Sequence, residues 1–347
     1  MEFKIAASII HHFYQSDASL GLRLGPEALP DSVELESLLS ELTSVYNAKP
    51  AKGYASFVGA EDDAEVDISG NFADLLTQWQ QQQLSFVAFS HSAARLLHQQ
   101  LEKYAMLEEG FLLFSHYQHT ATDYLTVSFL PSRDGVTIGP DLAVDKSSQL
   151  EISRVQLAAR IDLSTWSSDP AATDYISFIK GRAGRKVSDF FLDFLGCAER
   201  VNAKAQTQQL VEQVQKYTQA AELPAETSQA IRQQAYDYCD EQWRQGEKVQ
   251  VQDLATQFQV AAPQAPDFMA FTQTQTDEPL ADNFPADRAT LRKLIKFQGQ
   301  GGGLSVGFDQ TLLNQRVKYD PTTDTLTIVG TPPNLRDQLR RYFGIDS

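Results

Sequence analysis

The stretch GFLLFSHYQHTATDYLTVSFL, residues 110–130, gives the clearest indication of the fold class. It contains two runs of aromatic, aliphatic and β-branched residues, at 111–114 and 124–129, and a third run follows at 155–161. Turn-forming residues, such as those at 132–135, separate the runs, and no helical pattern lies between them. Because strands that follow one another without intervening helices pair antiparallel, we expect an antiparallel sheet.

Helical patterns precede these strands. Apolar residues recur at near-helical spacing over 33–45, after Asp31 or Ser32 as a candidate N-cap, and helical spacing resumes at Asn71 and over 84–104. The segment 59–70 contains five acidic residues and predicts a solvated loop. We therefore expect residues 1–175 to form an α+β domain with an antiparallel sheet.

The remaining chain predicts three further parts. Residues 176–260 form a basic turn followed by a helical region, with helical patterns at 187–195, 202–222, 225–246 and 249–258. Residues 261–283 contain three prolines and predict an irregular linker. Residues 284–347 predict a small α+β unit with a helix at 287–297, a strand at 304–308, a hairpin at 316–329 and a helix at 335–343. The fold class is therefore α+β.

The net charge of −16 argues against a nucleic-acid partner, because affinity for DNA comes largely from neutralising phosphates. The charge is unevenly distributed, however. Residues 1–175 carry 10 basic and 24 acidic side chains, and residues 205–283 carry 4 and 12. Residues 176–204 carry 6 basic and 3 acidic side chains, and residues 284–347 carry 9 basic and 6 acidic ones. Two basic islands lie in an acidic chain, and at a Debye length of about 8 Å each can act locally.

The first island contains the stretch YISFIKGRAGRKVSDFFLDFLG, residues 175–196. Four cations fall within seven positions of it, namely Lys180, Arg182, Arg185 and Lys186. A strand that enters a glycine-bearing basic turn and then a helix presents cations and backbone N–H groups together, which suits phosphate oxygens. The alternative is a solvated loop whose cations pair with acidic neighbours.

The second island places cations at i,i+4 spacing on two expected helices. They are Arg288, Arg292, Lys293 and Lys296 on the first, and Arg336, Arg340 and Arg341 on the second. Such faces are usually ordinary solvated surface, but two of them in one unit are also typical of an electrostatic footprint for nucleic acid.

The stretch 175–196 resembles the signature of the YejK/NdpA nucleoid-associated proteins. The resemblance extends along the chain, through AARIDL at 158–163, NAKA at 202–205, FPADRATLR at 284–292, GQGGG at 299–303, DPTTDTLTI at 320–328 and GTPPNLRDQL at 330–339. It implies a protein of the bacterial nucleoid that binds double-stranded DNA with little sequence preference. The family has no catalytic motif to transfer, so the resemblance implies a binding protein and not an enzyme.

Several other signals are weak. The glycines of 299–303 lack the Lys-Ser/Thr pair of a phosphate-binding loop. His116 and His119 would face opposite sides of a strand, and no carboxylate cluster accompanies them. No nucleophile motif is present. We therefore expect no catalytic residues, no metal and no cofactor.

Location and partners follow from the same features. The N-terminal apolar stretch is too short for a signal peptide, and no run approaches the roughly 18 apolar residues of a membrane span. Two isolated cysteines, Cys197 and Cys239, suit a reducing compartment. We expect a cytoplasmic protein of the nucleoid without membrane contact. Homodimer formation is a further expectation, because duplicating modest cationic patches raises avidity.

Two rival functions remain. The first is an adaptor that uses the acidic N-terminal domain to bind other nucleoid proteins, with DNA contact secondary. The second is a metal-dependent nuclease built on Asp174 and Lys180, for which the sequence places no second carboxylate to hold Mg²⁺.

Overall fold

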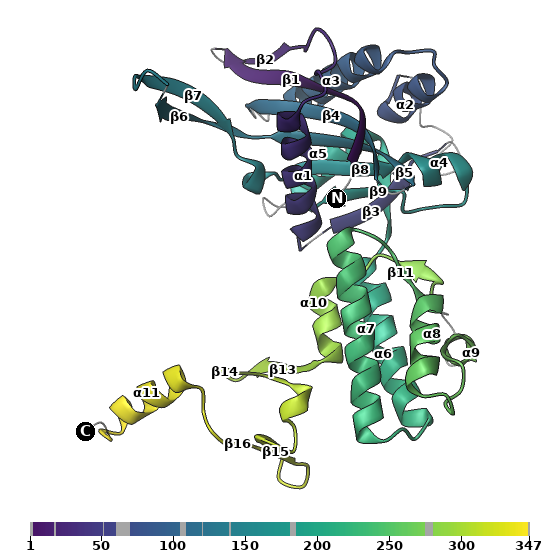
Figure 1. Ribbon diagram of the computed structural model, residues 1–347, viewed down its shortest axis with the longest axis vertical. Coiled ribbons are helices and arrows are strands. Elements are labelled where there is room, and N and C mark those ends of the chain that lie inside the picture. Colours follow the sequence, from purple (N-terminus) through teal and green to yellow (C-terminus); the bar gives the residue numbers. More distant parts are fainter. Residues whose placement is uncertain are drawn as a thin grey trace. The chain divides into compact units, whose positions relative to one another are not determined.

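An eight-stranded antiparallel sheet organises the first part of the protein (Figure 1). The computed structural model describes residues 3–16, 19–50, 52–59, 70–104, 109–119, 121–138, 140–180, 185–274 and 280–345, with the backbone alone for 185–189. The chain forms two compact units, residues 1–203 and 204–347. The predicted α+β class is confirmed.

The first unit contains the large sheet, one separate hairpin and five helices among its described residues. The sheet has the order β10-β3-β9-β8-β5-β4-β1-β2. Its strands are β1 (Phe3–Ser16), β2 (Ser19–Arg23), β3 (Lys52–Phe57), β4 (Gly110–His119), β5 (Thr122–Leu130), β8 (Leu157–Asp162), β9 (Ile176–Ile179) and β10 (Cys197–Val201). The hairpin joins β6 (Ser132–Ile138) to β7 (Val144–Leu150), before a 3₁₀ turn η1 (Ile152–Arg154). The helices are α1 (Val33–Ala48), α2 (Phe72–Gln80), α3 (Phe86–Lys103), α4 (Leu163–Ser168) and α5 (Arg185–Leu195).

The two faces of the sheet differ in chemistry. On one face α2, α3 and α5 bury a large aromatic core that includes Phe72, Phe89 and Phe114. On the other face α1 covers a smaller apolar cluster. This second face also buries hydroxyl groups that bond to one another: Ser8 to Ser115 across β1 and β4 at 2.8 Å, and Tyr46 to Ser177 at 2.8 Å. The first side is therefore mainly aromatic, with His11 buried against Phe114, and the second side has hydroxyl groups that bond to one another.

Local sequence explains where the helices begin. The side chains of Ser32, Asn71 and Ser85 accept hydrogen bonds from backbone N–H groups three residues later, at 3.2, 2.9 and 3.1 Å. Each of these N-caps satisfies an N–H group that the first helical turn leaves without a partner. Of the two caps expected for the first helix, Ser32 is the one that acts.

Three expectations for this unit need correction. Residues 132–135 were expected to form a turn but belong to strand β6. The expected boundary at residue 175 lies inside the unit, because β9, α5 and β10 complete its sheet and core. Strands β1, β3, β7 and β10 were not predicted at all. The expected acidic loop lies largely outside the described residues, which omit 60–69.

The second unit begins with a helical bundle around its own apolar core. Its elements are α6 (Ala203–Ala220), α7 (Ala225–Gln245), β11 (Val249–Gln250), α8 (Val251–Ala261), α9 (Phe268–Thr274), β12 (Asn283–Phe284), α10 (Arg288–Leu291) and a 3₁₀ turn η2 (Arg292–Leu294). The expected linker at 261–283 is incorrect for its described part, because α9 buries Phe268 and Phe271 against Tyr217 and Phe258. Among the described residues, no helix has the length and apolar character needed to cross a membrane.

The chain ends in a segment that we call the C-terminal arm, residues 296–345. It comprises β13 (Lys296–Gly301), β14 (Leu304–Asp309), a 3₁₀ turn η3 (Gln310–Leu312), β15 (Val317–Asp320), β16 (Thr325–Ile328) and α11 (Pro333–Tyr342). The predicted hairpin, its turn at 320–324 and the closing helix are confirmed. The expected helix at 287–297 is wrong in its second half, since α10 ends at Leu291 and a strand begins at Lys296.

Buried His11 predicts a specific sensitivity to acid. Its Nδ1 accepts a hydrogen bond from Gly25 N–H at 3.1 Å. Burial, with help from His91 and Arg95, lowers the pKa of His11 from 6.5 to about 4. The unfolded chain therefore takes up the proton first, so stability is complete above pH 6.5 and decreases as the pH falls towards 4. We expect this group alone to cost about 2 kcal/mol between pH 7 and pH 5.

Urea unfolding of His11→Gln at both pH values measures that contribution. The variant should lose less stability on acidification than the wild type, whereas His12→Gln, at the half-exposed neighbouring position, should behave like the wild type. An unchanged pH dependence in His11→Gln would assign the acid sensitivity to other groups.

Candidate nucleic-acid interface

The first basic cluster follows strand β9 and extends into helix α5, so the predicted strand and the helix after it are confirmed, while the predicted turn at 181–184 lies outside the described residues. Lys180 follows β9 directly, and Arg185 and Lys186 are the first two residues of α5. Arg182 lies outside the described residues, and only the backbone is described for Arg185 and Lys186. Helix α5 is held by Phe190, Phe191, Phe194 and Leu195, all buried in the aromatic core. The second half of α5 therefore packs against the sheet.

Lys180 makes an ion pair that the sequence did not reveal. Its Nζ lies 2.5 Å from Glu199 Oε1 on β10, with the two side chains 40% and 35% exposed. Strand β3 lies between β9 and β10 in the sheet, and the lysine reaches across it at Gly53. A Cβ atom at Gly53 would lie 2.8 Å from Lys180 Cε and 2.1 Å from Phe178 Cζ. Because Gly53 has no side chain, the lysine can cross β3 at this position and reach Glu199.

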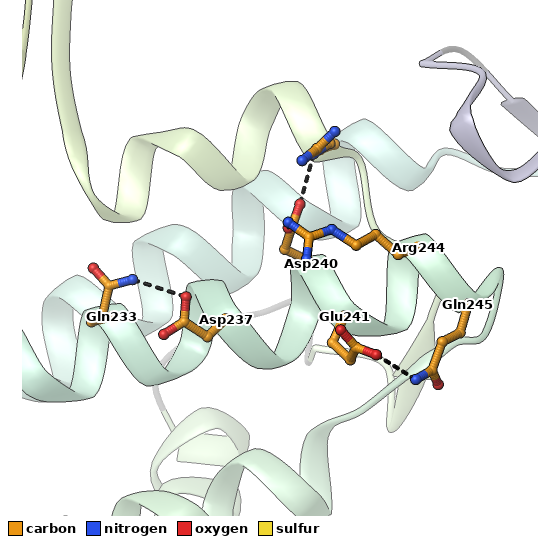
Figure 2. Close-up of polar contacts among 7 residues, drawn as sticks. Gln233, Asp237, Asp240, Glu241, Arg244 and Gln245 are labelled. Carbon is orange, nitrogen blue, oxygen red and sulfur yellow. Dashed lines mark hydrogen bonds and ion pairs between the residues drawn. The ribbon is translucent and has the colours of Figure 1, made fainter.

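Arg288, the first residue of α10, is paired with residues of α7 in the second unit. Its Nε lies 2.7 Å from Asp240 Oδ1 on α7, and its guanidinium stands 4.7 Å from the centre of the Trp243 ring. Asp240 is 3% exposed, and Figure 2 shows its second partner, Arg244, whose Nη2 lies 2.5 Å from Oδ2. A buried carboxylate with two arginine partners is a structural arrangement, and it holds α10 to α7.

The other cations of this region do not form the expected helical row. Arg292 is exposed in the 3₁₀ turn, and Lys293 donates to Gln208 Oε1 at 2.6 Å. Lys296 opens strand β13 and lies 3.3 Å from Asp309 Oδ1 on β14. Because the helix ends before position 292, the predicted stacking of 288, 292 and 296 on one helix face is wrong.

Helix α11 carries three exposed cations of the predicted set. Arg336, Arg340 and Arg341 all lie on its surface. Arg336 is 60% exposed and lies 3.6 Å from Asp337, a contact of little energetic weight between exposed groups. Arg340 donates to the Ile345 carbonyl at 3.3 Å, within the helix terminus. The helix therefore presents guanidinium groups to solvent, where phosphates could reach them.

Other chemistry finds little support in the geometry. Within the described ranges, no three His, Cys, Asp or Glu side chains gather in a way that would hold a metal ion. Cys197 and Cys239 are free and buried, and burial raises the pKa of both thiols, to about 12 for Cys197. Thiols that stay protonated are poor nucleophiles and poor ligands.

Comparison with known proteins gives consistent matches. A model of the family described as nucleoid-associated protein YejK matches residues 9–336. Nucleoid-associated proteins of Shewanella pealeana and of Shewanella sp. strain ANA-3 are each 42% identical to this chain, over 343 and 342 residues. Each alignment covers 98% of both chains. A nucleoid-associated protein of Shewanella denitrificans is also 42% identical, over 98% of this chain and 99% of its own.

Proposed function

The chain belongs to the family of nucleoid-associated protein YejK, and on this premise we propose that it binds double-stranded DNA with little sequence preference. The observation that carries the proposal is the basic segment between β9 and α5, which places four cations in seven positions of an otherwise acidic unit. The names of the relatives favour neither the adaptor nor the nuclease. The proposed location is the nucleoid.

The four cations of this segment are the proposed principal DNA contacts. Lys180, Arg182, Arg185 and Lys186 would meet phosphate oxygens beside the first turn of α5, where free backbone N–H groups add donors. The exposed cations of the second unit would assist, namely Arg292, Lys296, Arg336, Arg340 and Arg341. Arg288 would contribute least, because Asp240 already neutralises it. Phosphate contacts carry no base identity, which accounts for low selectivity.

A salt series tests the proposal. Fluorescence anisotropy with two duplexes of unrelated sequence should give similar affinities for both. A plot of log affinity against log salt should have a slope of about −3 to −4 if four phosphates are neutralised. Absence of binding at about 20 mM salt, where electrostatic attraction is strongest, would refute DNA binding.

The ion pair of Lys180 predicts that Glu199 restrains DNA binding. Replacing Glu199 by glutamine removes the carboxylate that competes with phosphate for Lys180. We expect Glu199→Gln to bind duplex DNA about 3- to 10-fold more tightly, with a steeper salt dependence, because one more cation is available. Anisotropy titration at fixed salt measures the change.

Glu151→Gln is the matched control. It removes one negative charge from another ion pair of the same unit, in which Glu151 Oε2 lies 3.0 Å from Arg154 Nη1. Its DNA affinity should stay close to that of the wild type. Equal gains in both variants would attribute the effect to net charge and not to Lys180.

A further inference from the structure

The hairpin β15–β16 of the C-terminal arm has one apolar face. Val317 pairs with Ile328 and Tyr319 with Leu326, so all four side chains share one side of the hairpin. Of the described residues of the arm, Val317 alone is buried. The other three are between 37% and 50% exposed. The opposite side of the hairpin holds charged and hydroxyl-bearing residues. The hairpin is therefore amphipathic, as strands that pack against a partner are, but its apolar side is largely exposed to solvent.

The hairpin β13–β14 repeats this arrangement. Phe297 pairs with Phe308, their ring centres 5.4 Å apart, and Leu304 lies on the same side of the hairpin, 66% exposed. Each hairpin is a separate two-stranded sheet among the described residues. Hairpins of two strands are marginally stable alone, and their outer edges offer unpaired backbone groups.

Helix α11 (yellow in Figure 1) has an apolar stripe formed by Leu335, Leu339, Tyr342 and Phe343, at positions i, i+4, i+7 and i+8. These side chains are 43%, 42%, 84% and 67% exposed. At 100° per residue, Arg341 points away from the stripe. Arg341 therefore lies on the face opposite the stripe, whereas Arg336, the residue after Leu335, lies at the edge of the stripe.

The size and chemistry of these faces indicate what covers them. Eleven large apolar side chains of the arm are between 37% and 84% exposed. Together they present on the order of 1,000 Å² of apolar surface, enough for the ~800 Å² that each partner buries in a stable protein interface. The two hairpin faces carry no charged side chain, so they have no group that attracts the phosphates of DNA. Charge-poor, strongly apolar faces are typical of homodimer interfaces, and free hairpin edges are self-complementary about a two-fold axis.

We infer that the C-terminal arm is the surface through which two copies of this chain associate. Burial of apolar surface favours the association, and electrostatic repulsion between two chains that each carry a net charge of −16 opposes it. Salt screens that repulsion, so the dimer becomes stronger as ionic strength rises. DNA binding responds in the opposite direction, since salt weakens attraction to phosphates. The two properties can therefore be separated by ionic strength alone.

The molar mass of the full-length protein in solution tests this inference. Light scattering and sedimentation of the wild type should give twice 38.6 kDa, with a smaller dissociation constant at about 0.5 M than at about 0.05 M salt. The double variant Ile328→Glu with Leu339→Glu places a carboxylate on two of the apolar faces. Its dimer dissociation constant should rise at least about 100-fold, because each carboxylate would be buried without a partner.

Thr327→Glu is the matched control for the single variant Ile328→Glu, which is measured beside the double variant, because it adds one carboxylate at the neighbouring position on the opposite face of β16, across from Lys318. It should dimerise like the wild type. A second variant, Tyr342→Ser, removes a side chain that is 84% exposed and should weaken the dimer without altering the circular dichroism spectrum. A wild type that stays monomeric at about 50 µM overturns the inference, as does a double variant that remains dimeric. A monomer whose arm amides exchange slowly also overturns it, because the arm would then be covered by its own chain.

Discussion

Replacing Lys180, Arg182, Arg185 and Lys186 together by glutamine is expected to weaken duplex binding about 100- to 1,000-fold at 0.15 M salt. Each phosphate contact contributes about 0.9 to the salt slope, so four contacts are worth up to about three powers of ten at this concentration. Glutamine keeps much of the side-chain volume and removes the charge. Anisotropy titrations at several salt concentrations should also show the slope falling towards zero.

A matched set of four cations elsewhere in the same unit provides the control. Lys4, Arg133, Lys146 and Arg154 are all exposed, and their replacement by glutamine changes the net charge by the same amount. This control should lose little affinity. Equal losses in both sets would mean that only bulk charge matters, and unchanged binding in the first set would remove the β9–α5 segment from consideration. Thermal melting of both variants excludes a loss of fold.

Replacing Asp240 by asparagine is expected to reduce the free energy of unfolding by about 2–4 kcal/mol. Asp240 is 3% exposed and neutralises Arg288 and Arg244, which are 34% and 58% exposed. Removal of the charge leaves two guanidinium groups without their carboxylate at the contact between α7 and α10. The partial exposure of the arginines keeps the expected loss below that of a fully buried pair. Urea unfolding followed by circular dichroism measures it.

Two acidic residues on the same helix are natural controls (Figure 2). Asp237 accepts a hydrogen bond from Gln233 at 2.9 Å, and Glu241 accepts one from Gln245 at 2.5 Å, both on the exposed side of α7. Asp237→Asn and Glu241→Gln should change stability by less than about 0.5 kcal/mol. If Asp240→Asn also changed the free energy of unfolding by less than about 0.5 kcal/mol, the buried ion-pair network would not hold α10 to α7. The DNA affinity of Asp240→Asn should keep the salt dependence of the wild type.

The sequence predicted the fold class and most helices, because these depend on local patterns. Apolar spacing and a serine or asparagine cap located α1, α2 and α3. Strands β3 and β6 were missed for a physical reason. Residues 52–57 contain lysine, glycine and serine, and residues 132–138 are polar and largely exposed. β3 pairs with β9 and β10, which lie far along the chain, and β6 pairs with the neighbouring strand β7; in both, the polar composition carries little local signal for a strand.

The candidate site could be predicted only in part for the same reason. The strand at 176–179 and the helix that follows it were predicted from the sequence. The partners of the cations did not, since Asp240 precedes Arg288 by 48 residues and Glu199 meets Lys180 across a third strand. Charge counts locate cations, but only tertiary structure shows which carboxylates already neutralise them.

The hydroxyl pairs beneath α1 also specify how the strands align. Ser8 and Ser115 face each other in the β1–β4 register, and their neighbours Ile9 and Phe114 point into the aromatic core. Sliding β1 by one residue would turn Ser8 towards the phenylalanines and separate the bonded oxygens, while Ile9 would leave the aromatic core. A one-residue slip of β1 against β4 is therefore disfavoured both by the lost hydrogen bond and by the exchange of a buried apolar side chain for a polar one.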